Sequence, residues 1–115
     1  MPCGTEESMD IENLQDKARR ASALLKAMSN QHRLLILCQL QSGERSVGEL
    51  ERLIGLSQSA LSQHLARLRR DELVRTRRAA QTIYYSLNGI EATEVIGTLY
   101  RLYCAEPEPA RDVAE

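Results

Sequence analysis

The cysteines are the residues of this chain with the most reactive side chains. Cys38 lies inside the apolar run LLILCQL, Cys104 follows an apolar segment in RLYCAE, and Cys3 stands near the start. A thiol can act as a nucleophile, an oxidisable group or a metal ligand, but in apolar surroundings it is most often an inert small hydrophobe. No C-x-x-C spacing is present to predict a zinc knuckle or a thioredoxin-type motif. Any chemistry of these thiols therefore requires the fold to bring them together.

Basic side chains are concentrated in one segment. The whole chain has a formal net charge of -1. Residues 57–80 hold six arginines and two carboxylates, which gives this segment +4 and leaves -5 for the rest. A basic stripe on an acidic body is typical of a DNA-binding protein, although a solvated charged helix is the commoner origin of such a run.

Apolar spacing predicts the elements that position these groups. The 3.6-residue period predicts helices, and the alternating pattern of LVRTR and TIYYSL predicts two strands. Asn30, Ser46 and Ser57 are expected to cap helices, and Gly55 is expected to form a tight turn. The helices are predicted over about 10–29, 31–41, 46–54, 57–72 and 88–104, and the strands over 73–77 and 82–87.

The order α-α-α-α-β-β-α predicts a winged helix-turn-helix, mainly α with a small β hairpin. The first and last helices carry more apolar surface than one small core needs, so we expect them to form a homodimer interface. Residues 10–104 are then one DNA-binding and dimerisation domain, between a flexible segment 1–9 and a disordered tail 105–115.

The helix over 57–72 and the hairpin supply candidate contacts to double-stranded operator DNA. Short hydroxyls and amides can approach base edges in the major groove, while a helix N-terminus and arginines suit phosphates. For any single residue a solvated surface position is an equally good interpretation. The candidates are Ser57, Gln58, Ser59, Ser62, Gln63, His64, Arg67, Arg75, Arg77, Arg78 and Gln81.

The segment SVGELERLIGLSQSALSQHLARLRRDELVRTRRAAQTIYYSL, preceded by LLKAMSNQHRLLILCQL, resembles the ArsR/SmtB family of bacterial winged-helix repressors. The resemblance extends from the first helix to Cys104. It implies a homodimeric repressor that sits on operator DNA and changes its hold when an inducer binds.

Metal sensing, which is common in that family, is disfavoured by the residues present. The family places cysteine ligands at the start of the third helix, where this chain has RSVGELER, and Asp and His ligands on the last helix, where it has IEATEVIGTLYRLYCA. The chain has two histidines, His32 and His64, so an N/S ligand set for zinc is hard to complete. We expect no metal site and no cofactor.

Cys38 and Cys104 resemble the sensor pair of a persulfide-sensing, sulfide-responsive branch of the family. By that resemblance the inducers are reactive sulfur species such as glutathione persulfide. They join the two thiols through a polysulfide bridge, and the repressor releases its operator. Cys3 has no assigned partner in this pattern.

Other interpretations stay open at this stage. A general redox repressor would form an ordinary disulfide with peroxide, and a metal-sensing repressor is a further alternative. A thiol enzyme lacks the paired acid and base or resolving cysteine motif that it needs, so we expect no enzyme. A winged-helix interaction module that never touches DNA is opposed by the wing arginines. The absence of a secretory signal or a bilayer-length apolar run predicts a cytoplasmic protein with no membrane partner.

Overall fold

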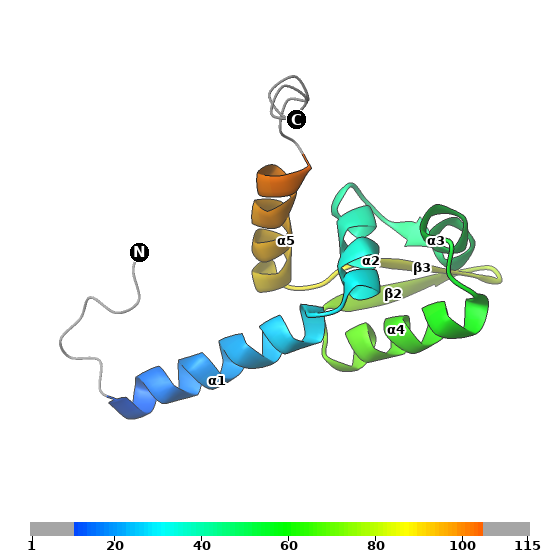
Figure 1. Ribbon diagram of the computed structural model, residues 1–115. Coiled ribbons are helices and arrows are strands. Elements are labelled where there is room, and N and C mark those ends of the chain that lie inside the picture. Colours follow the sequence, from blue (N-terminus) through cyan, green and yellow to red (C-terminus); the bar gives the residue numbers. More distant parts are fainter. Residues whose placement is uncertain (1–10, 105–115) are drawn as a thin grey trace, which may run out of the picture.

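The computed structural model describes residues 11–104 as one winged helix-turn-helix unit (Figure 1). The predicted flexible segment 1–9 and disordered tail 105–115 lie outside the described residues. The predicted fold class is confirmed, with one additional short strand. In chain order the elements are α1 (Ile11–Met28), α2 (Gln31–Gln41), β1 (Arg45–Ser46), α3 (Val47–Ile54), α4 (Gln58–Arg70), β2 (Val74–Ala79), β3 (Thr82–Leu87) and α5 (Ile90–Tyr103).

Three side chains begin the three central helices, as their spacing predicts. The Asn30 side chain accepts hydrogen bonds from the backbone N–H groups of His32 and Arg33. Ser46 forms a capping box with Glu49, and Ser57 accepts from the backbone N–H of Ala60. Because each cap satisfies amide groups that have no partner inside the helix, these starts are encoded locally.

The turn between α3 and α4 requires a glycine. Gly55 has φ 83°, in the left-handed region that side chains with a Cβ avoid, and its N–H donates to the carbonyl of Glu51. α3 therefore stops there, and α4 begins at Gln58 in a new direction.

The sheet differs from the predicted two-stranded hairpin. β1 pairs with β3, so the antiparallel sheet has the strand order β1-β3-β2. The hairpin is also tighter than the predicted RAAQ loop. β2 continues to Ala79 and β3 starts at Thr82, with Ala80 in the turn at φ 57°. Arg78 consequently lies in the strand, opposite Ile83.

The core lies where α2, α3, α4 and the sheet meet. α2 packs against α3, α4, β3 and α5, so it is the element that connects the core to the last helix. The largest fully buried side chains are Ile36, Leu37, Leu50, Leu61, Leu68 and Ile96. This apolar centre fixes α4 and the hairpin relative to each other.

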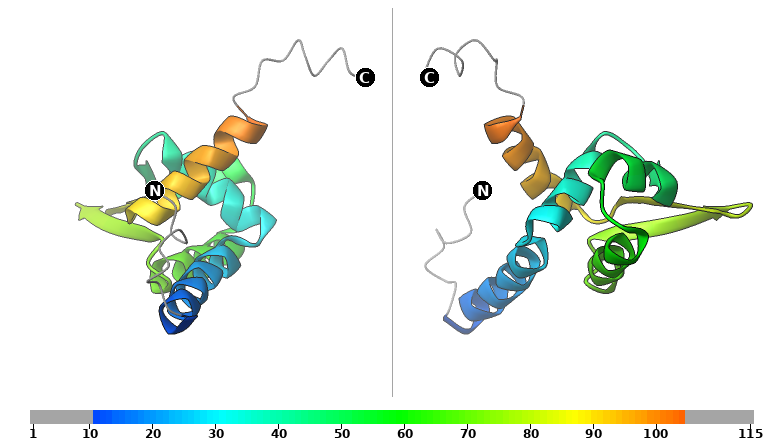
Figure 2. Two further views of the ribbon diagram at one scale, coloured as in Figure 1. Left: turned by 90° about the vertical axis from the view of Figure 1, so that its left-hand side faces the viewer. Right: turned by 45° about the vertical axis from the view of Figure 1, so that its right-hand side comes forward.

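The outer helices α1 and α5 extend away from this core (Figure 2). α1 has only Ala27 and Met28 buried, both at its C-terminal end. Large apolar side chains are exposed along both helices, namely Ile11, Leu14, Leu25, Ile90, Tyr100, Leu102 and Tyr103. No helix in the described residues is long and apolar enough to cross a membrane.

Candidate nucleic-acid interface and thiol pair

α4 has one face in the core and one in solvent. Leu61, Leu65 and Leu68 are buried, whereas Ser59 and Gln63 are exposed. Ser57 caps the helix, so the first amides of α4 are oriented outward in the way that suits a phosphate. These predicted positions are thus free to meet a ligand in the major groove.

A groove of about 630 Å³ lies between α4 and the sheet. Gln58, Ser62 and Arg69 contribute to its α4 side, and Ile83 and Tyr85 contribute to the sheet side. The predicted contacts Gln58 and Ser62 therefore face the space between the helix and the wing.

His64 is not a surface residue of the same kind. Its ring lies 5.7 Å from the ring of His32, centroid to centroid, between α4 and α2. Burial lowers the pKa of His64, and the cation of Arg33 and the neighbouring His32 lower it further. The Nδ1 atom of His32 is buried without a hydrogen-bond partner among the described residues. His64 is thus packed against His32 between α4 and α2.

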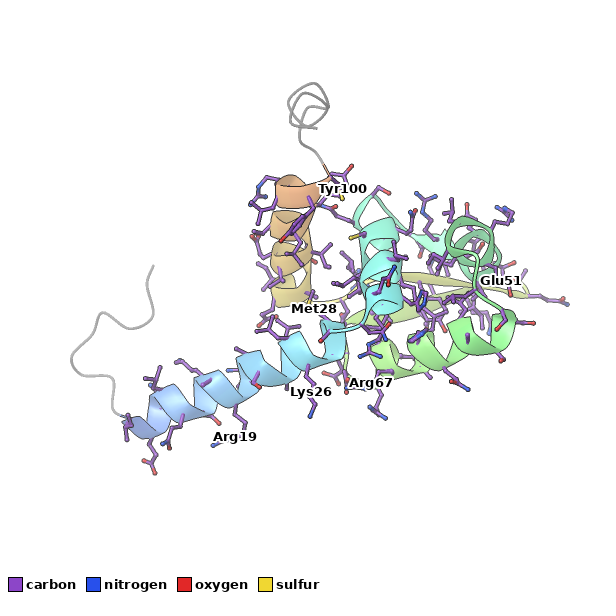
Figure 3. All side chains as sticks on the ribbon, viewed as in Figure 1. Arg19, Lys26, Met28, Glu51, Arg67 and Tyr100 are labelled. Atoms are coloured by element: carbon purple, nitrogen blue, oxygen red, sulfur yellow. The ribbon has the colours of Figure 1, made fainter. Side chains whose placement is uncertain are left out.

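Arg67 is engaged within its own helix. Its Nε donates to Asp71 Oδ2 at 2.9 Å, and this bond holds the pKa of the Asp71 carboxyl below its ordinary value. Arg67 also lines a groove of about 620 Å³ together with Lys26 of α1 (Figure 3). It therefore points toward the junction of α4 with α1.

The wing carries four predicted contacts, with Arg75 near its base and Arg77, Arg78 and Gln81 nearer its tip. Arg75 donates to Ser86 Oγ across the hairpin at 3.4 Å. Arg77 forms a two-point ion pair with Glu44. Arg78 and Gln81 are exposed, and neither has a side-chain hydrogen bond within residues 11–104 that would compete with DNA.

Glu44 is the residue that sequence reasoning missed at this site. It lies in the segment after α2 and is 33 positions before Arg77 in the chain. A single acidic residue in a polar loop carries no periodic signal, and only the pairing of β1 with β3 brings it beside the wing.

The two candidate sensor thiols come from packed elements, α2 and the end of α5. Both are free, Cys38 half-buried against the core and Cys104 exposed at the C-terminal cap of α5. Burial raises the pKa of the Cys38 thiol, and the charge of Cys104 raises this pKa further. The two thiols belong to helices that pack against each other. In residues 11–104 no group of three or more His, Cys, Asp or Glu side chains is arranged to hold a metal ion.

Comparison with known proteins identifies similar regulators. Residues 30–76 match the family described as "Bacterial regulatory protein, arsR family". The chain is 51% identical over 104 residues to the "Transcriptional activator HlyU" of Vibrio cholerae, which covers 90% of this chain and 96% of that protein. It is 40% identical over 106 residues to the "Biofilm growth-associated repressor" of Xylella fastidiosa, with coverage of 92% and 93%.

A solved structure shares the same arrangement. The structure described as reduced HlyU from Vibrio cholerae superposes with a TM-score of 0.79 at 53% identity, and it covers 82% of this chain and 99% of that one. The similarity thus includes the outer helices as well as the helix-turn-helix.

Proposed function

We propose a sensing mechanism from the premise that this chain belongs to the ArsR family of bacterial regulatory proteins, and is therefore a DNA-binding transcriptional regulator and not an enzyme. In this mechanism the protein is a cytoplasmic homodimeric repressor that leaves its operator when reactive sulfur species join Cys38 to Cys104. We propose repression as the mode of regulation because a dimer bound across a promoter blocks the access of RNA polymerase to it.

The observation that carries the proposal is that two free thiols of different exposure lie on α2 and at the end of α5, two helices that pack against each other. Cys104 is exposed, so a reagent as large as glutathione persulfide can reach it. Cys38 is half-buried with a raised pKa, so it is the slower nucleophile at neutral pH. Cys38 lies on α2 and Cys104 at the end of α5, and the contact between these two helices supports a bridge made of a short chain of sulfur atoms.

The chemistry needs only glutathione persulfide as co-reactant. The Cys104 thiolate attacks the outer sulfur of the persulfide, a Cys104 persulfide forms, and glutathione leaves as its thiolate. A second molecule converts Cys38 in the same way. The Cys38 persulfide then attacks Cys104 Sγ, and hydrogen sulfide leaves. The product is a bridge with one sulfur between the two Sγ atoms.

The DNA-binding surface in this proposal consists of the exposed side of α4 and the wing. The exposed side chains of Ser59 and Gln63 read base edges, the Ser57 cap and Arg78 meet phosphates, and Gln81 approaches the minor groove from the wing tip. Gln58, Ser62, Arg75 and Arg77 are second-rank candidates because they face the groove or have partners in the chain. His64 and Arg67 stabilise α4 in this proposal, His64 by packing on His32 of α2 and Arg67 by its bond to Asp71 at the end of α4.

The bridge acts on DNA through α2. α2 packs against α3, α4 and β3 on one side and α5 on the other. Because the exposed apolar residues of α1 and α5 suit a second chain, α5 belongs to the dimer interface in this proposal. Fixing α2 to α5 then changes the position of each α4 relative to the dimer axis, and DNA tolerates only a spacing of one helical turn between the two reading helices.

The test combines intact mass and DNA affinity on the same samples. The reduced protein is treated with glutathione persulfide or with hydrogen peroxide, and its affinity is measured for a duplex selected from random DNA by the reduced protein. We expect persulfide to give a Cys38–Cys104 crosslink with added sulfur and at least a tenfold loss of affinity. Cys38→Ser and Cys104→Ser should abolish both effects, whereas the control Cys3→Ser should retain them.

Other outcomes change the proposal in defined ways. An equal response to peroxide, with a crosslink of unaltered sulfur content, makes the protein a general redox repressor. Two unreacted thiols in a protein that still binds duplex return Cys38 to the core and require a different inducer. Binding that does not weaken with salt contradicts phosphate contact itself.

A further inference from the structure

Arg77 of the wing already forms an ion pair with a carboxylate of the protein, that of Glu44. Its Nε donates to Glu44 Oε2 at 2.9 Å and its Nη2 donates to Glu44 Oε1 at 2.8 Å. The guanidinium carbon lies 4.6 Å from the centre of the Tyr84 ring, and Tyr84 is the residue opposite Arg77 in the hairpin. The arginine is thus oriented on one side by a carboxylate and on the other by an aromatic face.

Glu44 is held in place by its neighbours. The next residue, Arg45, begins β1 and pairs with Tyr85 of β3. Arg45 also donates from Nε to the carbonyl of Gln39 at 3.3 Å and from Nη2 to Ser42 Oγ at 3.2 Å. These bonds anchor the segment after α2 on both sides of Glu44, so the backbone of Glu44 does not depend on Arg77 for its position.

The ion pair is accessible to a competing anion. The Arg77 side chain is 55% exposed and that of Glu44 is 35% exposed. The hydrogen bonds from Arg77 lower the pKa of Glu44, so its carboxylate is charged at neutral pH. An exposed pair of this kind is weak in water, and a phosphate presents the same two-oxygen geometry to a guanidinium. A DNA phosphate can therefore replace the carboxylate.

We propose that Glu44 is an internal substitute for DNA phosphate, which neutralises Arg77 in the free protein and so limits the affinity of the wing for DNA. The inference rests on the proposed DNA-binding function of the wing. Binding in the wild type exchanges one Arg77 ion pair for another and leaves Glu44 uncompensated beside the duplex. Removing the carboxylate leaves Arg77 free, so each subunit gains one phosphate contact at full strength.

Salt dependence distinguishes this role from a general charge effect. Each phosphate neutralised steepens the dependence of log K on log salt by about 0.9, so two contacts per dimer add about 1.8. Glu44→Gln should therefore bind more tightly at low salt and lose roughly tenfold more affinity than the wild type between about 50 and about 200 mM salt. The increase in slope should be absent when Arg77→Gln is combined with Glu44→Gln.

The matched control is Glu51→Gln on α3, which removes the same charge from the helix-turn-helix. Glu51 is labelled in Figure 3. Among the described residues Glu51 has no side-chain ion pair, whereas Glu44 has one. Affinities are measured by fluorescence anisotropy on fully reduced protein, and circular dichroism melting verifies that each variant is folded. An increase in affinity for Glu44→Gln with an unchanged slope, or one matched by Glu51→Gln, overturns the inference.

A second result would also overturn it. If Glu44→Gln binds more weakly, the carboxylate positions Arg77 for DNA and does not compete for it. Neither result affects the thiol mechanism, because the experiment uses reduced protein. Failure of the reduced wild type to bind duplex is a separate observation, and it contradicts the proposed function.

Discussion

The central unit, made of α2, α3, α4 and the sheet, differs from the outer helices α1 and α5 in helix capping and in the burial of apolar side chains. α2, α3 and α4 each begin with a side-chain cap, and their buried leucines share one core with the sheet. α5 begins at Gly89 without a side-chain cap, and α1 buries only its last two residues. Most of the buried core lies in the central unit, whereas the outer helices expose apolar faces that a second chain covers under the proposed function. Cys38 and Cys104 lie on opposite sides of this boundary.

The largest expected effect tests the central unit. Leu61 is fully buried on α4, so Leu61→Ala should lower the free energy of unfolding by about 3 kcal/mol through lost burial and a residual cavity. Urea denaturation followed by circular dichroism measures this loss. Leu53→Ala on α3 is the control, because that side chain is 50% exposed and lies outside the proposed dimer interface. Equal losses in the two variants would contradict a core in which Leu61 is buried.

The second prediction tests the outer helices. Leu102 of α5 is 64% exposed, and a carboxylate placed in an apolar interface loses its hydration. Leu102→Glu should raise the dissociation constant of the dimer at least tenfold, measured by sedimentation equilibrium. Leu53→Glu on α3 is the matched control, since Leu53 is half-exposed on the central unit. If Leu53→Glu weakened the dimer and Leu102→Glu did not, the dimer interface would include α3 and not α5.

The sequence predicted the central unit well because its signals are local. The helix caps act within three residues, and the apolar period of α4 is repeated at every turn. β1 has two residues and no period, so nothing in the sequence marked its pairing with β3. Ala80 is not a typical residue for a positive φ, and the predicted loop was therefore too long. The Glu44–Arg77 pair depends on the long-range pairing of β1 with β3.

The thiol pair was predicted in a different way. Apolar neighbours alone favoured an inert Cys38, and only the resemblance to a family joined it to Cys104. The structure adds that the two cysteines lie on α2 and at the end of α5, which pack against each other. Two of the candidate DNA contacts on α4 also have partners inside the protein. Arg67 was expected on the DNA side of α4 and His64 at the boundary between its two faces, and the sequence did not predict that Arg67 bonds to Asp71 or that His64 packs on His32.

The third prediction concerns a difference in reactivity between Cys38 in the central unit and Cys104 on the outer helix α5. At neutral pH iodoacetamide should modify Cys104 about tenfold faster than Cys38, because Cys38 is half-buried and its pKa is raised. A raised pKa means less thiolate at pH 7, so the Cys38 rate should continue to rise with pH beyond the ordinary thiol range. Peptide mapping over time measures both rates. In urea the difference should vanish, and its persistence there would show that local sequence, not the fold, controls reactivity.

The smallest effect concerns the contact between the two regions. Gly97 lies within α5, where a Cβ would meet Gln41 Nε2 of α2 at 3.6 Å, an ordinary van der Waals contact. Glycine costs up to about 1 kcal/mol relative to alanine inside a helix, so Gly97→Ala should stabilise the protein by up to that amount. Thermal melting at several protein concentrations measures the gain. Gly55→Ala is the opposing control, because its positive φ makes any Cβ unfavourable.

A loss of stability in Gly97→Ala would carry information about the thiol mechanism. It would mean that α2 and α5 approach more closely than one subunit requires, as they would if the dimer pressed the two helices together. The glycine would then preserve the close approach on which a bridge between Cys38 and Cys104 depends. If Gly97→Ala instead stabilises the protein and leaves the yield of the persulfide crosslink unchanged, the glycine is not needed for the bridge. The approach of Cys38 to Cys104 would then depend only on the two thiols and the helix ends that carry them.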